Sequence, residues 1–438
     1  MTDGYDRIRV LWPDHLGIAR GKYLPARLAH KGTSHCAAVF ALSYDRSMVP
    51  APGSFLLDGM PDVEADFDPE SVKPGWEDDR TGVAVGSLSM HGHPFPYSSR
   101  YALQQAIADW GALGLRPKVG IELEAYVLEP NGDGGWQRWQ TPRAFVYGTG
   151  LAADPVGVID DIMRTAEASQ FKVESINAEF DEAQFELTLE YDDALAAVDD
   201  AFLFRVLARE VALSHGLDLT FLGKPFAELS GSGVHVNFSF ADATGNNSLA
   251  DPSTAHGLSA GALSCVAGLI EHHQGLAALC APTVNAYRRL LPGQINGYWA
   301  NWGLEHRSAA NRIPSARGAG TRIESRLADG AANLHLAVAA VLQAARLGYV
   351  DQLDAPDPLT TDGFEESNTD VCVAADLGAA IGHLKADEAL RQAVGSEVTD
   401  NFIAIKEAEW ERYLTAVGTH EPGPQASDWE IENYLMYH

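Results

Sequence analysis

The sequence predicts an α+β protein with a small β-rich N-terminal domain in residues 1–95 and a larger domain in residues 96–438 that is built on a curved sheet. Residues 5–95 are strand-like and rich in turns, and the prolines of His91-Gly-His-Pro-Phe-Pro96 make a natural boundary. From residue 100 onward, apolar residues recur with helical spacing. Later strands carry polar side chains on one face only, which indicates a sheet curved around a polar interior.

The individual elements follow from local patterns. Arg7–Trp12 alternates and contains β-branched residues, and Val83–Leu88 is a second apolar run. Residues 100–114 place large apolar side chains on one helical face, and the segment ends at Gly114. Further strands are expected at residues 117–129, 175–189 (two short strands), 233–241 and 320–327, with a hairpin turn at residues 131–135. Further helices are expected at residues 155–169, 192–215, 259–279, 331–347, 387–395 and 400–413, with a solvated acidic loop at residues 351–370.

Composition excludes several classes of function. The chain has 31 Lys and Arg against 60 Asp and Glu, a formal net charge of −29, which disfavours binding of nucleic acid or of an anionic membrane over a wide face. The longest apolar stretches, residues 258–270 and 334–347, are rich in Ala and broken by polar residues, so they predict buried helices. The first residues lack an apolar run, and the four cysteines lack metal-ligand spacing. These features predict a cytoplasmic protein without a signal peptide.

Polar side chains share one face on several strands, because residues two apart in a strand point to the same side. These faces carry carboxylates, one histidine and arginines, with hardly any lysine. The residues are Glu122 and Glu124; His235, Asn237 and Ser239; Arg322, Glu324 and Arg326; and Glu179 and Glu186 on strands that flank a turn. The solvated face of an antiparallel sheet is the alternative interpretation, although such faces favour Lys, Thr and Ser.

Five carboxylates and the histidine predict a metal centre. Several carboxylates cannot all stay ionised at close quarters without cations. Carboxylates with a single histidine suit a hard divalent ion such as Mg²⁺ or Mn²⁺ better than Zn²⁺, and five acids can hold two ions. The candidate ligands are Glu122, Glu124, Glu179, Glu186, Glu324 and His235.

A second cluster is basic, which is unusual in so acidic a chain. Residues 286–326 contain seven arginines and no lysine: Arg288, Arg289, Arg307, Arg312, Arg317, Arg322 and Arg326. Arginine binds carboxylate and phosphate in planar, bidentate geometry, and two metals beside arginines imply phosphoryl transfer. Glycine turns at residues 231–233 and 318–320 allow close approach of a ligand. Neither a P-loop nor a GxGxxG motif after a strand occurs, which disfavours the common nucleotide-binding folds.

The sequence resembles the glutamine synthetase family over nearly its full length. Five segments match in order, and the last two are highly specific together. They are Gly120-Ile-Glu-Leu-Glu124; Asn177-Ala-Glu179 with Gln184-Phe-Glu186; Gly231-Ser-Gly-Val-His235; Asn285-Ala-Tyr-Arg-Arg-Leu-Leu-Pro-Gly293; and His306-Arg-Ser-Ala-Ala-Asn-Arg-Ile-Pro314 with Arg322-Ile-Glu-Ser-Arg326. The chain is class I-like in size and is closest in character to the branch that makes γ-glutamylamides or γ-glutamylpolyamines.

The resemblance implies an N-terminal β-grasp domain and a catalytic domain with a curved antiparallel sheet. It also implies a homo-oligomer of stacked rings, typically a dodecamer, with active sites between neighbouring subunits. The substrates would be ATP, glutamate and an amine, with two or three Mg²⁺ or Mn²⁺ ions and no nucleic-acid or membrane partner. One ion would be held by Glu124, Glu179 and Glu186, and another by Glu122, His235 and Glu324.

The resemblance also implies roles for other polar residues. Gly231 and Arg289 would bind glutamate, and Arg326 would lie near its γ-carboxylate. Arg307 and Arg312 would neutralise the transferring phosphate, and Arg307 would also contact substrate, so the expected catalytic residues are Arg307, Arg312 and Arg326. The expected nucleotide contacts are Glu174, Asn237, Ser239, Arg312, Arg317 and Arg322, with Arg317 in place of a lysine that the family carries near the phosphates.

The implied reaction has two steps. ATP phosphorylates the γ-carboxylate of glutamate, and a nitrogen nucleophile then displaces phosphate from the acyl phosphate. The leading interpretation is an ATP-dependent carbon–nitrogen ligase that joins glutamate to an amine. The alternatives are a glutamine synthetase that uses ammonia and a non-catalytic ring protein, although the latter is disfavoured because all five metal carboxylates are present.

Three departures from the family pattern bear on the nucleophile and on regulation. Asn237 stands where ammonia-using members usually carry a second histidine, and residues 351–375 contain no tyrosine that resembles an adenylylation site. In ammonia-using members an acid follows Pro-Gly by two residues, but Ile295 occupies that position here, and no Asp or Glu lies between Cys280 and Glu305.

The apolar residue favours an alkyl or aryl amine as the nucleophile. Ile295 with Tyr298, Trp299 and Trp302 would suit the carbon skeleton of such an amine. Core or interface packing is the alternative explanation for the three aromatic residues. An acid from a neighbouring subunit, such as Asp45, is an alternative base, so the missing acid weakens ammonia use without excluding it.

Overall fold

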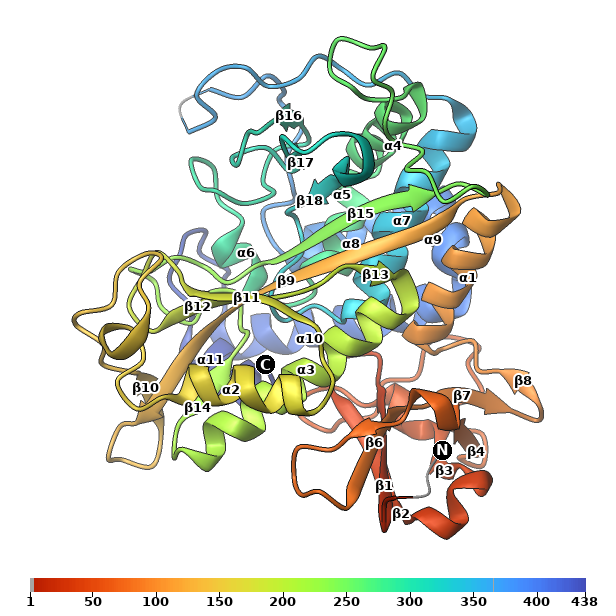
Figure 1. Cartoon of the computed structure of the whole chain (residues 1–438), viewed down its shortest axis with the longest axis vertical. Helices are drawn as coiled ribbons and strands as arrows, with labels where there is room; N and C mark the ends of the chain where they lie inside the picture. The colour runs from red at the N-terminus through yellow and green to blue at the C-terminus, as the bar shows by residue number, and fades with distance from the viewer. Residues whose placement is uncertain (1–3, 365) are drawn as a thin grey trace.

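The structure confirms the predicted α+β class. The computed structural model describes residues 4–364 and 366–438, and the N-terminal strands gather at one end of the molecule (Figure 1). They form two four-stranded sheets, in the orders β2-β1-β6-β5 and β3-β4-β7-β8. Their bounds are β1 Arg7–Pro13, β2 Ala19–Pro25, β3 Thr33–Cys36, β4 Asp62–Asp66, β5 Lys73–Pro74, β6 Thr81–Val85, β7 Ser87–Met90 and β8 His93–Pro94.

A separate apolar core draws residues from both small sheets. Ile8 and Val10 of β1 belong to it, together with Val63 of β4. Leu11 of β1 belongs to the larger core of the molecule instead, because successive residues of a strand point to opposite faces. The N-terminal strands therefore pack against the rest of the chain, and the domain boundary at residue 95 stays a prediction.

A ten-stranded sheet forms the centre of the molecule. Its main path runs β11-β12-β9-β15-β18-β17-β16, and β10, β13 and β14 also pair with β9. Neighbours along this path are antiparallel except for the parallel pair of β16 and β17. The bounds are β9 Arg116–Pro130, β10 Trp136–Arg138, β11 Val173–Ala178, β12 Gln184–Leu189, β13 Asp192–Asp193, β14 Asp218–Thr220, β15 Val234–Ala241, β16 Trp302–Leu304, β17 Asn311–Ile313 and β18 Ile323–Ser325.

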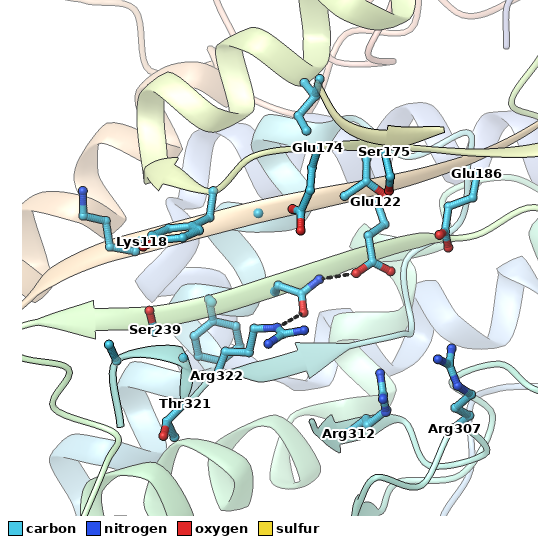
Figure 2. Close-up of a pocket in the computed structure, with 18 of the residues that line it drawn as sticks. Lys118, Glu122, Glu174, Ser175, Glu186, Ser239, Arg307, Arg312, Thr321 and Arg322 are labelled. Atoms are coloured by element: carbon cyan, nitrogen blue, oxygen red, sulfur yellow. Dashed lines mark hydrogen bonds between the residues drawn. The ribbon is translucent and has the colours of Figure 1, made fainter. Parts of the chain in front are cut away.

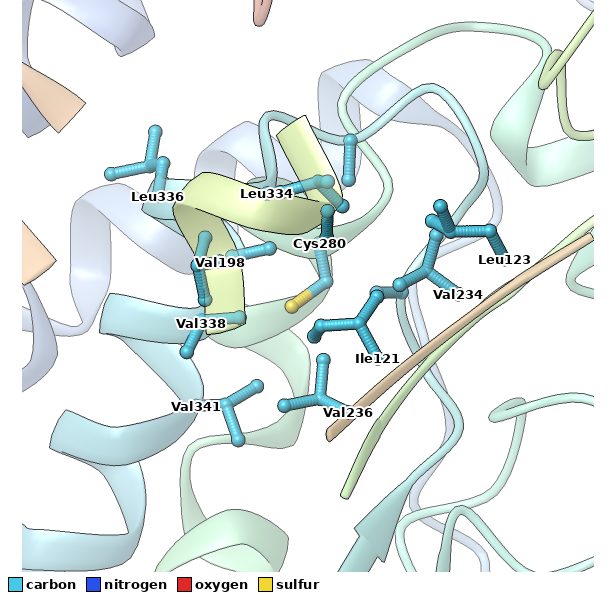
Figure 3. Packing of buried hydrophobic residues seen from close by; sticks show 14 of the residues in the cluster. Ile121, Leu123, Val198, Val234, Val236, Cys280, Leu334, Leu336, Val338 and Val341 are labelled. Atoms are coloured by element: carbon cyan, nitrogen blue, oxygen red, sulfur yellow. The ribbon is translucent and has the colours of Figure 1, made fainter. Parts of the chain in front are cut away.

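The two faces of this sheet differ in chemistry. Glu122 of β9 lies on the polar face (Figure 2), whereas Ile121 and Leu123 of β9 and Val234 and Val236 of β15 point toward helices α3, α5 and α7 (Figure 3). Burial of the apolar side chains on one face determines which residues lie on the polar face, because a strand alternates its side chains. The helix bounds are α1 Ser99–Ala112, α2 Val158–Ala168, α3 Ala194–Ser214, α4 Ala260–Glu271, α5 His273–Cys280, α6 Ala286–Arg289, α7 Leu334–Asp351, α8 Leu377–Ala386, α9 Glu388–Val394, α10 Ser396–Val417 and α11 Asp428–Tyr434.

Helix α1 illustrates how local sequence specifies an element. The Ser98 side chain accepts a hydrogen bond from Tyr101 N at 3.3 Å and so caps the first turn. Trp110 is buried, and its Nε1 donates to Leu342 O of α7 at 3.0 Å. Gly114, with a φ of 76°, then follows the helix in a left-handed conformation that favours glycine.

Three predicted elements differ from the structure. The apolar run at residues 83–88 is divided between β6 and β7, which belong to different sheets. The helix expected at residues 259–279 is divided into α4 and α5, because His272 leaves helical geometry (φ −92°, ψ 6°) and its Nδ1 lies 2.8 Å from Asp387 Oδ2. The strand expected at residues 320–327 is limited to β18, because Gly318–Gly320 form a 3-10 turn. Helices α8 and α11 and strands β16 and β17 were not predicted.

The long apolar stretches form helices of the protein core, as expected. Helix α7 is buried along most of its length and packs against α4 and α1. Among residues 4–364 and 366–438, no helix has both the length and the apolar composition needed to cross a membrane.

Candidate active site

The register of the large sheet brings the predicted polar residues side by side. Strand β9 lies between β12 and β15, so Glu124 is opposite Glu186 on one side and Glu122 is opposite His235 on the other. Directly opposite residues on one face of a sheet have neighbouring side chains. The polar faces that the sequence predicts for separate strands therefore form one continuous surface.

Glu122 makes two hydrogen bonds within this surface. Its Oε2 lies 2.7 Å from His235 Nδ1, and its Oε1 accepts from Asn237 Nδ2 at 2.9 Å. Asn237 Oδ1 in turn accepts from Arg322 Nε at 2.9 Å. The residue that stands in place of a second histidine thus links the carboxylate of Glu122 to an arginine.

Two groups of ligand atoms are close enough to share a metal ion. One group is Glu122, His235 and Glu324, and the other is Glu124, Glu186 and His235; within each, the ligand atoms lie within 4.8 Å of one another. The first group has the expected composition. In the second, His235 stands where Glu179 was expected.

Glu179 takes a different position from the one expected of a ligand in the second group. It follows β11, and its Oε2 accepts a hydrogen bond from Phe180 N at 3.1 Å. It still lines the cavity beside Glu186. Its membership of a metal site stays a prediction.

The electrostatics of these carboxyls fit a divalent cation. Burial, together with the charge of Glu122, raises the pKa of Glu186 to about 7. Burial alone would raise the pKa of Glu122, but the hydrogen bonds from His235 and Asn237 and the nearby positive charges of His235 and Arg326 together outweigh burial and lower this pKa to about 2. Burial and the charge of Glu124 raise the pKa of Glu179. One histidine does not balance so many carboxylates, and oxygen ligands with one imidazole are a donor set for Mg²⁺ or Mn²⁺.

Two arginines flank Glu324. Arg312 Nη1 lies 2.6 Å from Glu324 Oε2, and Arg326 Nη1 forms an ion pair with Glu324 Oε1. Among the described residues, the Nε atoms of both arginines are buried without a hydrogen-bond partner. Buried guanidinium donors without a protein acceptor fit an anionic ligand such as a phosphate.

A cavity of about 460 Å³ opens on the polar face. Figure 2 shows Glu122, Glu174 and Glu186 along one wall, with Arg307 and Arg312 across from them. A cavity of this size accommodates small-molecule substrates. The predicted residues that line it are Glu122, Glu174, Glu179, Glu186, Asn237, Ser239, Arg307, Arg312 and Arg322.

Other predicted residues adjoin the cavity lining. His235 contacts Glu122, and Glu324 contacts Arg312, while Glu124 pairs with Glu186 in the sheet. Arg326 reaches the site through its ion pair with Glu324. Gly231 and Arg289 pack against each other, since a Cβ added to Gly231 would lie 2.4 Å from Arg289 Cγ.

Arg317 is not brought to the cavity, contrary to expectation. Its Nε donates to His256 O at 2.7 Å and its Nη1 to Ala316 O at 2.9 Å, so main-chain carbonyls hold the guanidinium. Lys118 lines the cavity instead, with its Nζ 3.0 Å from Asp193 Oδ1. The alternation of β9 could have revealed Lys118, because it shares a face with Glu122.

Further lining residues also escaped sequence reasoning, among them Tyr147, Ser175, Thr188, Tyr191 and Thr321. Ser175 lies on β11 one position after Glu174, and a bulge between Val173 and Ser175 disturbs the alternation there. Tyr147 and Tyr191 lie in loops, where side chains do not alternate regularly and the sequence does not show which of them face a site.

Ile295 lines a second hollow beside the cavity. The residue is 50% exposed, and Arg307 lines both the hollow and the main cavity. The other residues around the hollow are Leu304, Glu305, His306, Ser308, Asp362 and Phe364.

The three aromatic residues expected beside Ile295 do not line this hollow. Trp302 is 2% exposed, and its Nε1 donates to Pro356 O at 2.7 Å. Tyr298 packs against the main core and contacts the edge of the Trp299 ring, with 4.8 Å between ring centroids. Packing, the alternative considered for these aromatics, is therefore what the structure shows.

Comparisons with known proteins place this site in a family. The family described as "Glutamine synthetase, catalytic domain" matches residues 96–434. Glutamine synthetase of Methanocaldococcus jannaschii is 37% identical over 98% of this chain and 95% of its own length, and that of Halobacterium salinarum is 30% identical over 99% and 94%. The solved structure "Apo GmaS without ligand" is 30% identical, with a TM-score of 0.83 over 98% of this chain and 96% of that one. "GmaS/ADP complex-Conformation 1" is 29% identical, with a TM-score of 0.84 over the same shares. The chain belongs to the glutamine synthetase family.

Proposed function

We propose that the protein is an ATP-dependent ligase that joins L-glutamate to an amine through γ-glutamyl phosphate. In the first step a γ-carboxylate oxygen attacks the terminal phosphorus of ATP, and ADP leaves. In the second step the amine nitrogen, having lost a proton, attacks the acyl carbon, and phosphate leaves with the bonding electrons. Phosphorylation supplies the leaving group that a carboxylate lacks.

The position of Ile295 is the observation that favours an amine over ammonia as the nucleophile. An ammonium ion needs a carboxylate to bind and deprotonate it, and an aliphatic side chain offers neither. Ile295 is half exposed and lines the hollow with Leu304 and Phe364. An amine with a carbon chain gains about 0.8 kcal/mol for each CH₂ group that such side chains bury.

Two carboxylates line the same hollow and could accept the proton of the amine. These are Glu305 and Asp362, and Glu305 Oε1 lies 3.7 Å from Arg312 Nη2. A protonated amine would meet an acidic group and an apolar wall together. The same acids keep an ammonia-using enzyme as a second candidate.

The comparisons support both candidates to different degrees. Similarity to the structures of GmaS, a γ-glutamylmethylamide synthetase, supports formation of a γ-glutamyl amide. The relatives named glutamine synthetase favour ammonia. The two candidates share every step except the identity of the nucleophile.

The residues of the cavity have distinct roles in this proposal. The carboxylate–histidine groups would hold two or three Mg²⁺ or Mn²⁺ ions, which neutralise phosphate charge when bound. Arg307 and Arg312 would donate to the transferring phosphate, and Arg326 would keep Glu324 in place. Of the predicted nucleotide contacts, Glu174, Asn237, Ser239 and Arg322 line the cavity and would bind ATP together with Lys118, whereas Arg317 would not.

Phosphate release from purified protein with ATP, glutamate and Mg²⁺ tests the proposal. The nucleophiles are ammonium and a series of primary amines from methylamine to butylamine and benzylamine, and mass spectrometry identifies the products. We expect at least one amine to exceed ammonium in kcat/KM. Faster synthesis of glutamine from ammonium than of any amide would show that the second candidate is correct.

The predicted dodecamer of stacked rings remains part of the proposal. Mass photometry of the purified protein counts the subunits, and negative-stain electron microscopy shows whether rings form. A stable active monomer would contradict the predicted assembly.

A further inference from the structure

Three protein groups hold Arg289, the residue expected to bind glutamate. Its Nη2 donates to Leu327 O at 2.8 Å and to Ala328 O at 2.9 Å, and its Nε lies 3.3 Å from Asp329 Oδ2. Within residues 4–364 and 366–438, Nη1 is the one nitrogen of this guanidinium without a protein acceptor. Arg289 therefore has one nitrogen, Nη1, left to bind a substrate carboxylate, and not the two that bidentate binding would need.

That nitrogen lies near the metal-binding face. A Cβ added to Gly233 would lie 3.2 Å from Arg289 Nη1 and 3.6 Å from Glu124 Oε2. Gly233 N also donates to Glu124 Oε2 at 2.6 Å. A side chain at position 233 would crowd this nitrogen, so glycine lets the main chain pass close to both the guanidinium and Glu124.

A main-chain hydrogen bond holds the carboxylate of Asp329 independently of its contact with Arg289. The residue is 0% exposed, and its Oδ1 accepts a hydrogen bond from Ala331 N at 2.9 Å. Its Oδ2 is the oxygen that faces Arg289 Nε. A carboxylate with one oxygen bound to the main chain presents the other in a defined direction.

Two glycines make room for this ion pair. A Cβ added to Gly223 would lie 1.8 Å from Asp329 Oδ2, and one added to Gly231 would lie 2.4 Å from Arg289 Cγ. Neither position accepts a side chain unless the ion pair moves. Glycine is therefore needed at position 231 because a larger residue would collide with the side chain of Arg289.

We propose that Asp329 is a positioning residue that directs Arg289 Nη1 toward the α-carboxylate of glutamate. The inference rests on the proposed function, since it assigns a partner to the arginine that would bind glutamate. Arginine has several rotatable bonds, so a fixed guanidinium loses less freedom on binding than a mobile one. Loss of the anchor should weaken glutamate binding in the ground state and the transition state alike, which raises KM and leaves kcat unchanged.

Asp329→Asn tests this role, because it keeps the size of the side chain and removes the charge that faces Arg289. We expect the KM for glutamate to rise at least about tenfold, while kcat and the KM for ATP change less than about twofold. The matched control is Glu430→Gln, which neutralises the buried partner of the preceding residue, with Arg288 Nη2 at 2.9 Å from Glu430 Oε1. The control should lower the melting temperature without changing the glutamate KM.

Gly223→Ala is a second route to the same displacement. It keeps Asp329 in the sequence, but the new Cβ forces the carboxylate away from Arg289. We expect the same rise in glutamate KM, and this variant decides the question if Asp329→Asn does not fold. An unchanged glutamate KM in a folded Asp329→Asn or Gly223→Ala protein would overturn the role of Asp329.

The outcomes also separate this inference from the proposed function. A wild-type protein that releases no phosphate with glutamate and any amine or ammonium contradicts the proposed function. An active wild type whose glutamate KM equals that of both variants contradicts only the positioning role.

Discussion

Arg288 and Arg289 are neighbours in the chain, but their side chains form separate buried ion pairs. Arg288 Nη2 lies 2.9 Å from Glu430 Oε1, whereas Arg289 Nε lies 3.3 Å from Asp329 Oδ2. Arg288 also donates to Tyr413 OH at 3.0 Å, so it joins α6 to the C-terminal helices α10 and α11. Of the two arginines, Arg289 is the one whose side chain lies beside Gly231 and Gly233.

Arg289→Lys keeps the positive charge but loses the nitrogens that bind Leu327 O, Ala328 O and Asp329. We expect the KM for glutamate to rise at least about tenfold, which corresponds to about 1.4 kcal/mol of binding free energy. Steady-state kinetics at saturating ATP provide the measurement. The control, Arg288→Lys, should instead lower the free energy of unfolding by about 1–3 kcal/mol. A glutamate KM that changes only in the control would reverse the assignment.

Ile295→Glu restores the acid that ammonia-using members carry two residues after Pro-Gly. We expect kcat/KM for ammonium to rise at least about tenfold and that for the preferred alkylamine to fall, because a charged side chain replaces an apolar contact. Glutamine and amide products are measured in competition by mass spectrometry. Ile295→Leu keeps an apolar residue and should preserve the wild-type preference. Equal preferences in all three proteins would show that this position does not select the nucleophile.

Glu122→Gln removes one charged ligand from the group that it forms with His235 and Glu324. We expect the Mg²⁺ concentration for half-maximal activity to rise at least about tenfold, and a chelator should abolish wild-type turnover. Binding of Mn²⁺, followed by electron paramagnetic resonance, reports the loss independently of activity. Glu174→Gln, at a lining residue outside the two ligand groups, should leave Mn²⁺ binding unchanged. Turnover that persists in chelator would rule out the metal requirement.

Lys118→Met should raise the KM for ATP at least about fivefold, since it removes the lysine that lines the cavity. Arg317→Met should leave that KM within about twofold, because main-chain carbonyls hold the guanidinium of Arg317 and this residue does not line the cavity. Initial rates at varied ATP and saturating glutamate distinguish the two variants. The opposite ranking would restore the role that the sequence suggests for Arg317.

Asp199 links three helices and should make stability depend on acid pH. Its Oδ1 lies 2.8 Å from His335 Nε2, and Arg100 Nη2 lies 2.7 Å from its Oδ2. Burial would raise the pKa of Asp199, but the hydrogen bonds from His335 and Arg100 lower it below its usual 3.8. Its stabilising contribution is therefore complete above the pKa of the unfolded chain and is lost as the pH falls through the lower, folded pKa.

Asp199→Asn should lower the free energy of unfolding by about 3–5 kcal/mol at pH 7, because it leaves a buried arginine without its counter-charge. Urea unfolding between pH 7 and pH 3 should show a smaller loss of stability on acidification than in the wild type. Asp160→Asn, at an exposed residue that pairs with Arg164 on the same helix, is the control and should change stability by less than about 1 kcal/mol. Equal acid sensitivity of wild type and Asp199→Asn would exclude this carboxylate as the source.

Strong local periodicity made the central strands predictable from sequence. The strand expected at residues 117–129 is β9, Arg116–Pro130, and the one expected at residues 233–241 is β15, Val234–Ala241. The alternation in each also identified the polar face correctly. The break between α4 and α5 was not predictable, because it depends on a contact between His272 and Asp387 of a distant segment.

The residues of the site could be predicted from sequence, but the contacts between them could not. A strand's own sequence shows that Glu124 and Glu186 are polar-face residues, but only the register between strands shows that His235 joins them. The direction of Arg317 depends on His256 O, 61 positions away in the chain. Sequence patterns therefore identified the polar side chains of the site, while contacts between segments far apart in the chain determined which of these side chains lie together.

Strand β9 pairs with β10, β12, β13, β14 and β15, which has a consequence for synthesis of the protein. Glu122 and His235 are 113 positions apart, so β9 leaves the ribosome long before β15 can cover its second edge. A long apolar strand with an open edge attracts other chains, and pairings between distant segments form slowly. The strand that carries Glu122 and Glu124 thus keeps an unpaired edge, which favours aggregation, while the nascent chain grows.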